Sequence, residues 1–422
     1  EPAVDLVQEA VSLIVKTNPG MRMHLIFLFI GLISMLGCSE RPVNHSDLFW
    51  ADKPVIAERR VVDGDTVIVC DVGKIMDKVV LPFEVIATDY QMIPLENTVK
   101  AFLGRSMTPT IVTDNYLGFY CFNFMPFKLF KRTGEFVCDA GRIGQGPGEY
   151  FSLVDAQIDE ANQRIYLLPL LISKIYVYDF QGNFLSDIPL AYSPSGWRFR
   201  IYPDREEVIV ATPVYERTPS LVWTQDFQGN VLKEIRADDF PPCRTLSSNT
   251  VINNYHQGLF DLFIFSPLES STAYLYHYDN KANRMVPQFR MENYGKSIFI
   301  YELPSCYIVE SVHSTEPSNL MDLEGEKIIV DKKTLKGCYI TGVRMPFGVV
   351  FGQYNLFTQM SNSYFAVNEF SGHILDLMEL SDMRDLSPSE KAELDKVMKI
   401  INSTDDEISI IFTGRLRNRP AW

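Results

Sequence analysis

The feature of this chain that most constrains its fold is a short pattern that returns five times, at intervals of 47 to 53 residues. Each copy has a strand end, a turn rich in Gly, Asn, Asp or Lys, and a return to apolar residues, which predicts a β-hairpin. A period near 50 with several short strands is typical of β-propeller blades. The copies are LFKRTGEFV (Leu129–Val137), VYDFQGNFL (Val177–Leu185), TQDFQGNVL (Thr224–Leu232), HYDNKANRM (His277–Met285) and IVDKKTLKG (Ile329–Gly337).

The length of the repeating region sets the number of blades. Roughly 300 residues, from about Val85 to Leu380, hold six units of about 50 residues. We expect the sixth turn within YFAVNEFSGHILDLMEL (Tyr364–Leu380), where the pattern is degenerate. Runs such as EVIVATPVY, rich in β-branched and aromatic residues, fit strands packed on both faces. The predicted fold class is all-β, a six-bladed β-propeller.

Helix is nearly absent from the pattern until the C-terminal region. Ser387 and Glu390 form a capping box around Pro388, which predicts an amphipathic helix over about 387–402. Its apolar face would carry Leu394, Val397, Met398 and Ile401. The chain then ends in EISIIFTGRL, which we expect to pair with the N-terminal strand region and seal the ring, because open sheet edges invite aggregation.

The stretch GRIGQGPGEY (Gly141–Tyr150) has the glycine density of a phosphate loop without its other parts. It lacks the Lys and Ser or Thr of a P-loop, leads into a strand, and carries Glu149, which opposes phosphate. We therefore expect no nucleotide site. Glycines here would allow positive φ and close approach between one blade's outer strand and the next blade's inner strand. Whether this joint lines the axial channel or is only a well-preserved turn stays open.

Several segments resemble a known family. The stretch from Gly141 to Leu185 resembles the NHL-type propeller repeat. IPLENTVKAFLG (Ile93–Gly104), GQGPGEY (Gly144–Tyr150), LYHYDNKANRMVPQF (Leu275–Phe289) and DDEISIIFTGRL resemble the six-bladed, NHL-like or TolB-like propeller lipoproteins of Bacteroidetes, over roughly residues 60–418. The resemblance implies the fold and export to the cell envelope, with no catalytic set. Its motif residues are Gly144, Gly146, Pro147, Gly148, Glu149 and Tyr150.

The N-terminal region resembles a lipoprotein signal. After Arg22, an apolar run of 12 residues (Leu25–Leu36) is too short to span a bilayer comfortably, and Gly37-Cys38 follows. Cys38 is the predicted lipidation site, with an ordinary secretory signal as the alternative. We expect residues 1–20 to be an upstream extension without function, 21–37 the signal peptide, 38–58 a tether and 59–422 the propeller, anchored at the cell envelope, with the outer membrane favoured.

Composition limits the ligands. A net charge of -14 and a pI near 5.0 argue against a nucleic-acid surface. Asp63 and Asp65 flank Gly64 with calcium-loop spacing but lack the further ligands, so a hairpin turn is favoured. We expect no metal and no cofactor. The dispersed His256, His277 and His313 suggest surface positions, and the scattered cysteines suggest buried free thiols.

Three classes of function remain open, of which one is a purely structural role within an envelope complex, with a broad exposed apolar patch as its mark. The leading hypothesis is a noncatalytic propeller that binds a glycan, peptide or envelope protein on one face of the ring. The alternative is a glycan hydrolase or lyase, argued by analogy with other propellers. One aromatic-rich blade could supply a sugar platform, although interblade core is favoured; its residues are Tyr116, Phe119, Tyr120, Phe122, Phe124, Phe127 and Phe130.

Overall fold

The computed structural model of the chain describes residues 45–103, 110–120, 125–193, 198–212, 219–239, 250–253, 261–264, 274–292, 297–312, 326–352, 360–361, 363–381, 383–404 and 406–418. The chain divides into two compact units, Glu1–Leu48 and Phe49–Trp422. The second unit is a six-bladed β-propeller, so the predicted fold class is confirmed.

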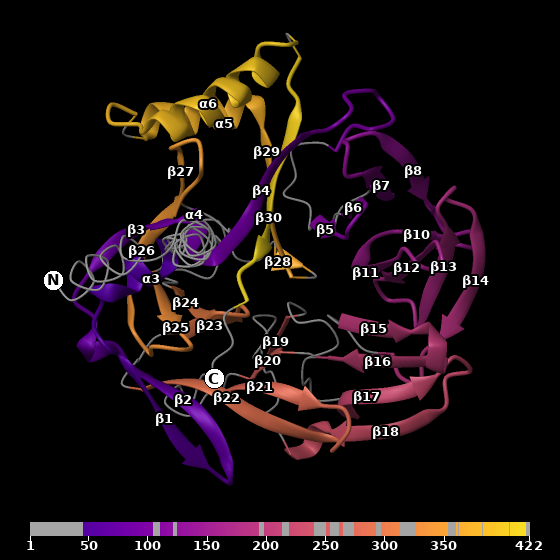
Figure 1. Cartoon of the computed structure of the whole chain (residues 1–422). Helices are drawn as coiled ribbons and strands as arrows, with labels where there is room; N and C mark the ends of the chain where they lie inside the picture. The colour runs from indigo at the N-terminus through magenta and orange to yellow at the C-terminus, as the bar shows by residue number, and fades with distance from the viewer. Residues whose placement is uncertain are drawn as a thin grey trace, which may run out of the picture. The chain divides into compact units, whose positions relative to one another are not determined.

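Blades 1 to 3 are four-stranded antiparallel sheets whose strands follow one another in the chain (Figure 1). In each blade the first strand is innermost and the fourth lies at the outer edge. Blade 1 has β5 (Thr110–Val112), β6 (Tyr116–Phe119), β7 (Phe127–Lys131) and β8 (Phe136–Ala140). Blade 2 has β11 (Leu153–Asp159), β12 (Arg164–Pro169), β13 (Lys174–Asp179) and β14 (Phe184–Pro189), and blade 3 has β15 (Arg198–Tyr202), β16 (Glu207–Ala211), β17 (Ser220–Asp226) and β18 (Val231–Arg236).

Blades 4 to 6 follow the same plan with additions from the N-terminal part of the chain. Blade 4 has β19 (Thr250–Asn253), β20 (Asp261–Ile264), β21 (Tyr274–Asp279) and β22 (Arg284–Glu292). Blade 5 has β23 (Ser297–Glu302), β24 (Cys306–Val312), β25 (Lys327–Asp331) and β26 (Gly337–Arg344), with β27 (Val350–Phe351) paired to the end of β26. Blade 6 has β28 (Met360–Ser361), β29 (Tyr364–Phe370), β30 (Ser409–Leu416) and β4 (Ala87–Pro94).

Blade 6 closes the ring with strands from distant parts of the chain. β30 pairs antiparallel with β29 on one side and with β4 on the other, from Ile410↔Pro94 to Leu416↔Ala87. The prediction that the C-terminal strand pairs with the N-terminal strand region is confirmed. This pairing gives β30 a partner on both edges.

The N-terminal strands before β4 cover the outer edges of two more blades. The hairpin of β1 (Ala57–Val62) and β2 (Asp65–Asp71) adds to β22, and β3 (Lys78–Pro82) adds to β26, both by parallel pairing. The chain thus runs along the rims of blades 4, 5 and 6 in turn before blade 1 begins. We call β1 to β4 the N-terminal belt. It supplies backbone partners to strand edges that would otherwise be open.

All five repeats lie where the sequence predicted, as hairpins between the third and fourth strands of blades 1 to 5. The turn glycines Gly134, Gly182 and Gly229 have positive φ. A Cβ on Gly182 would overlap the carbonyl oxygen of Asp139, in the outer strand of blade 1. A Cβ on Gly134 would likewise overlap the carbonyl oxygen of Pro94, in the outer strand of blade 6. Each of these two turns therefore packs against the backbone of the preceding blade.

One buried apolar cluster fills each of the six seams between neighbouring blades. The cluster between blades 1 and 6, for example, brings Phe119 and Phe130 against Ile411 and Ala366. Of the aromatic residues expected in the interblade core, Phe119, Tyr120, Phe127 and Phe130 are buried, Tyr116 is half-buried, and Phe122 and Phe124 lie outside the described residues. The core interpretation is confirmed for the buried four.

The helices differ from expectation in two places. α6 (Pro388–Ile401) begins with the predicted capping box of Ser387 and Glu390. The predicted sixth turn within Tyr364–Leu380 is wrong, because β29 leads directly into helix α5 (Ser371–Leu380). The segment SGHILDLMEL has Ile374, Leu377 and Met378 at helical spacing against the core, with Gly372 as its one glycine and no proline. The expectation that helix is nearly absent before residue 387 is corrected by α5 and the short helices α3 (His45–Ala51) and α4 (Phe83–Ile86).

Folded structure also precedes residue 59, where the sequence suggested that the propeller starts. Trp50 and Ile56 are buried, and the Nζ of Lys336 donates to the carbonyl oxygen of Trp50 at 2.8 Å. Large apolar side chains gain free energy by leaving water, which accounts for this packing. The last residues of the range expected to be a tether are therefore part of the folded unit.

The seam contact of the turn glycines leads to a stability prediction. Gly182→Ala should lower the free energy of unfolding by about 1 kcal/mol from its left-handed φ and about 1–3 kcal/mol more because the new methyl group displaces blade 1. The control is Gly64→Ala, since Gly64 also has positive φ but nothing lies within 4 Å of its Cβ position. Denaturant unfolding of both variants separates the two costs, and equal losses would contradict the seam contact.

Candidate functional site

The glycine-rich stretch connects the outer strand of blade 1, β8, to the inner strand of blade 2, β11. β9 (Arg142–Ile143) and β10 (Glu149–Tyr150) pair in parallel and close it into a compact loop. Within this loop the Oε2 of Glu149 accepts a hydrogen bond from the backbone N–H of Gly146 at 2.9 Å, and the N–H of Glu149 donates to the Gly146 carbonyl. The carboxylate of Glu149 thus occupies the position that a phosphate would need.

Tyr150 holds this loop against blade 1. Its side chain is fully buried, and its hydroxyl donates to the carbonyl oxygen of Ala140 and accepts from the N–H of Phe127, both at 2.7 Å. Those two residues face each other at the end of the β7–β8 ladder. From blade 2, the hydroxyl of Tyr178 donates to the carbonyl oxygen of Gly148. Burial raises the pKa of Tyr150, so its hydroxyl stays protonated as a donor.

The other residues singled out in the sequence lie apart from one another. Asp63 and Gly64 form the turn of the β1–β2 hairpin, which confirms the hairpin interpretation, and Asp65 accepts two hydrogen bonds from Arg284. His277 lies 2.5 Å from the buried carboxylate of Glu302, between blades 4 and 5. His256 and His313 lie outside the described residues.

The cysteines partly follow the expectation. Cys70, Cys138, Cys306 and Cys338 are buried free thiols. Burial raises the pKa of Cys70 and Cys338 to about 12, so both are poor nucleophiles at neutral pH. Cys38, Cys121 and Cys243 lie outside the described residues, and the predicted lipidation site stays a prediction.

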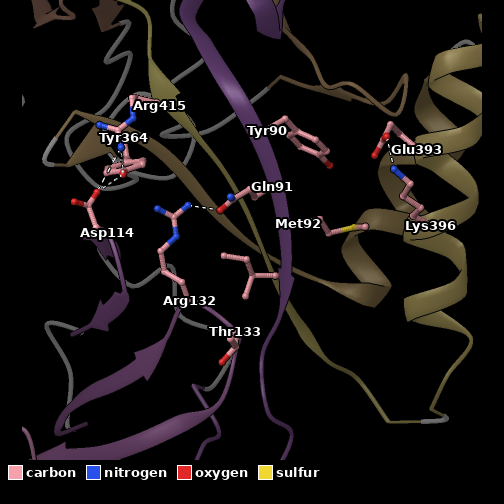
Figure 2. Close-up of a pocket in the computed structure, with 11 residues that line it drawn as sticks. Tyr90, Gln91, Met92, Asp114, Arg132, Thr133, Tyr364, Glu393, Lys396 and Arg415 are labelled. Carbon is pink, nitrogen blue, oxygen red and sulfur yellow. Dashed lines mark hydrogen bonds and ion pairs between the residues drawn. The ribbon is translucent and has the colours of Figure 1, made fainter.

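A polar groove lies where blade 6 meets blade 1 (Figure 2). It has a volume of about 630 Å³, within the range of small-molecule sites. We call it the seam groove. Its lining comes from β4, β29 and β30 of blade 6, from two turns of blade 1, and from α6: Tyr90, Gln91, Met92, Ile93, Asp114, Arg132, Thr133, Tyr364, Glu393, Lys396 and Arg415.

Tyr364 lies at the centre of the cationic part of the seam groove. The guanidinium carbons of Arg132 and Arg415 are 4.9 and 5.0 Å from its ring centroid. Arg415 faces Tyr364 across the β29–β30 ladder and donates to its hydroxyl at 2.8 Å, while that hydroxyl donates to Asp114 at 2.9 Å. Cation–π attraction and these hydrogen bonds hold both arginines beside one ring.

Arg132 is positioned by backbone contacts. It follows β7, and its N–H donates to the carbonyl oxygen of Asn115 at 2.8 Å. Its guanidinium donates to the carbonyl oxygen of Thr113 and to the side-chain oxygen of Gln91, so it connects blade 1 to blade 6. Both acceptors are neutral.

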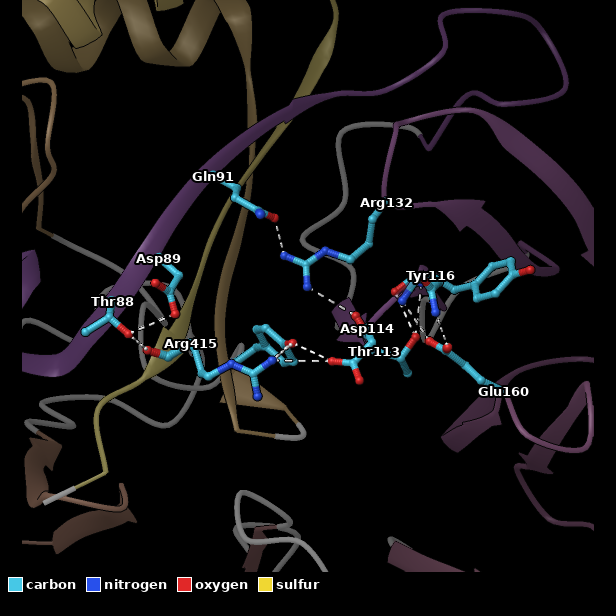
Figure 3. A network of polar contacts seen from close by, with 11 residues as sticks. Thr88, Asp89, Gln91, Thr113, Asp114, Tyr116, Arg132, Glu160 and Arg415 are labelled. Atoms are coloured by element: carbon cyan, nitrogen blue, oxygen red, sulfur yellow. Dashed lines mark hydrogen bonds and ion pairs between the residues drawn. The ribbon is translucent and has the colours of Figure 1, made fainter. Parts of the chain in front are cut away.

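Blade 2 also contributes to the network around Asp114 (Figure 3). Glu160, in the β11–β12 turn of blade 2, accepts from the backbone and side-chain N–H groups of Asn115 at 2.9 and 2.8 Å. Burial acts to raise the pKa of Glu160, but hydrogen bonds from Thr113 and Asn115 outweigh it and lower the pKa. The ionised carboxylate therefore holds the β5–β6 turn that carries Asp114.

The far end of the seam groove lies between β4 and α6. Glu393 and Lys396 form an ion pair of 2.6 Å along the helix. The hydroxyl of Tyr90 is buried without a hydrogen-bond partner within the described part of the chain. Burial raises its pKa. This end therefore combines a buried hydroxyl without a hydrogen-bond partner and the apolar side chain of Met92.

The sequence analysis missed these groove residues, although one signal pointed to them. In blades 2 to 5 the residue that opens the repeated turn is Asp, and Asp179 accepts from the backbone N–H groups of Gln181 and Asn183. In blade 1 the residue at this position is Lys131, and the next position, which is Phe180 in blade 2 and Phe227 in blade 3, is Arg132. Where one copy of a repeat loses the residue that stabilises the turn in the other copies, the replacing side chain is a candidate for another role.

The described residues carry no evident metal centre or membrane span. None of them gather into a group of three or more His, Cys, Asp or Glu side chains suited to a metal ion. Within the same residues, no helix has the length and apolar character needed to cross a bilayer.

These features define a six-bladed propeller with a preformed polar groove at its closing seam. The chain belongs to the family described as Domain of unknown function (DUF4934), whose profile matches residues 67–334. A candidate exported protein from Bacteroides fragilis NCTC 9343 is similar in structure, with a TM-score of 0.54 and 14% identity over 81% of this chain and 99% of that one. At this identity the likeness shows the fold.

A member of the DUF4221 family from Bacteroides vulgatus ATCC 8482 also matches, with a TM-score of 0.44 and 12% identity over 79% of this chain and 98% of that one. No curated protein matches the chain.

The loop held by Tyr150 leads to a second prediction. Tyr150→Phe should lower the free energy of unfolding by about 1–3 kcal/mol, because it leaves the Phe127 N–H and the Ala140 carbonyl buried without their partner. Tyr176→Phe is the control: Tyr176 is 8% exposed, and its hydroxyl has no hydrogen bond among the described residues. Its change should stay within about 0.5 kcal/mol by the same thermal or denaturant unfolding. Similar losses in both variants would contradict the role given to the Tyr150 hydroxyl.

Proposed function

We propose that this protein is a noncatalytic binding propeller, anchored by lipid at the cell envelope, that takes its ligand in the seam groove. The observation that carries the proposal is the preformed groove, in which hydrogen bonds fix Arg132, Tyr364, Arg415 and Asp114 from four chain segments. Fixed polar groups in a concave surface lose little freedom when a ligand binds, which favours affinity.

The chemistry of the groove supports binding over catalysis. A general base works best with a pKa near the working pH. Burial raises the pKa of Tyr364, its hydrogen bond to Asp114 raises it further, and Arg415 and Arg132 offset this only in part. The two carboxylates of the groove are each engaged, Asp114 with Tyr364 and Glu393 with Lys396. These groups suit recognition of a ligand better than cleavage of a glycan.

The envelope location rests on the N-terminal sequence. The apolar run before Cys38 and the similarity of the fold to a candidate exported Bacteroides protein both support export. A lipid on Cys38 would hold the propeller at a membrane surface, and we favour the outer membrane. The ligand classes that fit such a position are a glycan, a peptide or an envelope protein.

Blocking the seam groove tests the binding function. Thr133 is exposed in the turn that borders the groove, and Thr133→Trp should abolish binding by filling it. Gln181→Trp is the matched control, because Gln181 precedes the turn glycine of blade 2 as Thr133 precedes that of blade 1. The measurement is binding to an array of neutral and acidic oligosaccharides, peptides and envelope extracts. Ligand breakdown by the wild type would contradict a noncatalytic role, and equal binding by both variants would exclude the seam groove.

Replacing the predicted lipidation site tests the anchor. Cys38→Ser should abolish incorporation of labelled fatty acid and move the protein from the membrane to the soluble fraction of cells that express it. Ser39→Ala keeps Cys38 and should stay in the membrane fraction. If the Cys38→Ser variant still incorporates labelled fatty acid, the lipid is attached at another residue.

A further inference from the structure

The seam groove is a local concentration of positive charge on an acidic protein. Arg132, Lys396 and Arg415 face it against two carboxylates, Asp114 and Glu393, whereas the whole chain has a net charge of -14. Lys396 is neutralised by Glu393 at 2.6 Å. The excess positive charge therefore lies at the end of the groove around Tyr364.

Arg132 accounts for that excess. The two groups that accept hydrogen bonds from its guanidinium, the Thr113 carbonyl and the Gln91 amide, are neutral, and Arg132 has no carboxylate partner among the described residues. A guanidinium has five N–H donors in a rigid plane, so Arg132 retains donors for a ligand. A half-buried cation without a counter-ion favours an anionic group in the groove.

Arg415 can reach the same group. Its side chain is 55% exposed, and its contact with the exposed Asp114 is long, at 3.4 Å. Arg132 and Arg415 lie 4.9 and 5.0 Å from the centre of the same tyrosine ring, so a ligand that packs at this ring lies near both. One guanidinium binds a carboxylate or a phosphate through two parallel N–H···O bonds, and of the two anions the carboxylate is planar, like the guanidinium.

The remaining groups in the groove favour a saccharide as the bearer of that anion. Asp114 accepts hydrogen bonds and repels further negative charge, while Gln91 and Thr133 are neutral hydrogen-bonding groups. A densely charged acidic peptide would meet Asp114 unfavourably. A sugar residue that carries one carboxylate and several hydroxyl groups satisfies the arginines and also gives Asp114 donors.

We propose that the seam groove binds a carboxylate-bearing saccharide, a uronate, with the carboxylate against Arg132 and Arg415 and sugar hydroxyls on Asp114, Gln91 and Thr133. This inference rests on the proposed binding function of the same groove and narrows its ligand class. Because the attraction is electrostatic and partly exposed to solvent, affinity falls as salt rises.

The test is calorimetric titration of the purified full chain with trisaccharides of galacturonate, of alginate and of hyaluronan. Methyl-esterified trigalacturonate is the matched control ligand, because it keeps the ring and hydroxyls and loses the charge. We expect the acid to bind at least about tenfold more tightly than the ester, and Arg132→Gln and Arg415→Gln each to weaken acid binding about ten- to a hundredfold. Arg236→Gln on blade 3, where Arg236 pairs with Asp238, should bind as the wild type does.

Arg132→Lys tests whether the planar guanidinium or only its positive charge is needed. This variant should bind the acid about tenfold more weakly than the wild type, with the same dependence of affinity on salt. Melting temperatures of all variants identify any that fail to fold.

Three results would overturn the inference. If the acid and the ester bind with equal affinity, and the arginine variants bind as the wild type does, the groove still binds a saccharide but does not recognise its carboxylate. If acidic peptides or sulfated dextran bind in a way that needs the arginines, and no uronate binds, the ligand is an anion of another class. If neither the uronates nor any other member of the ligand array binds, the proposed binding function is contradicted as well.

Discussion

The pairing of β30 with β4 is the contact on which the rest of this fold depends. It gives blade 6 an outer strand and places blade 6 against blade 1, so that every blade has two neighbours. The seam between blades 6 and 1 has the same turn packing as the seam between blades 1 and 2. The turn glycine Gly134 packs on Pro94 of β4 as Gly182 packs on Asp139 of β8. The strand from the N-terminal part of the chain thus takes the place of a blade's own fourth strand.

The seams combine apolar packing with buried polar contacts that fix the register of neighbouring blades. Between blades 2 and 3, the buried Asp155 accepts from the N–H of Phe199 at 3.0 Å, and Gln157 accepts from that of Ile201. Burial raises the pKa of Asp155, and the neighbouring Arg198 and Arg200 oppose that rise. Apolar clusters alone tolerate sliding, whereas hydrogen bonds between specific groups define one position.

Local signals in the sequence predicted the repeated parts of the fold well. The five turns, the capping box at Ser387 and the closing strand each depend on residues within a few positions of one another, and all three appear in the structure. α5 was missed because Tyr364–Leu380 was assigned by its place in the period, although its apolar spacing is helical. The seam groove was out of reach, since residues as distant as Gln91, Arg132 and Arg415 meet only when the ring closes.

That the groove residues come from distant parts of the chain has a consequence for a chain that is synthesised from its N-terminus. Gln91 belongs to the first strand of blade 6 to emerge and Arg415 to the last, with five blades between them. Contacts of such long sequence separation form late and slowly during folding. A truncated or partly folded chain can therefore display most blades and still have no groove, so the complete groove is confined to molecules whose last strand has been made and paired.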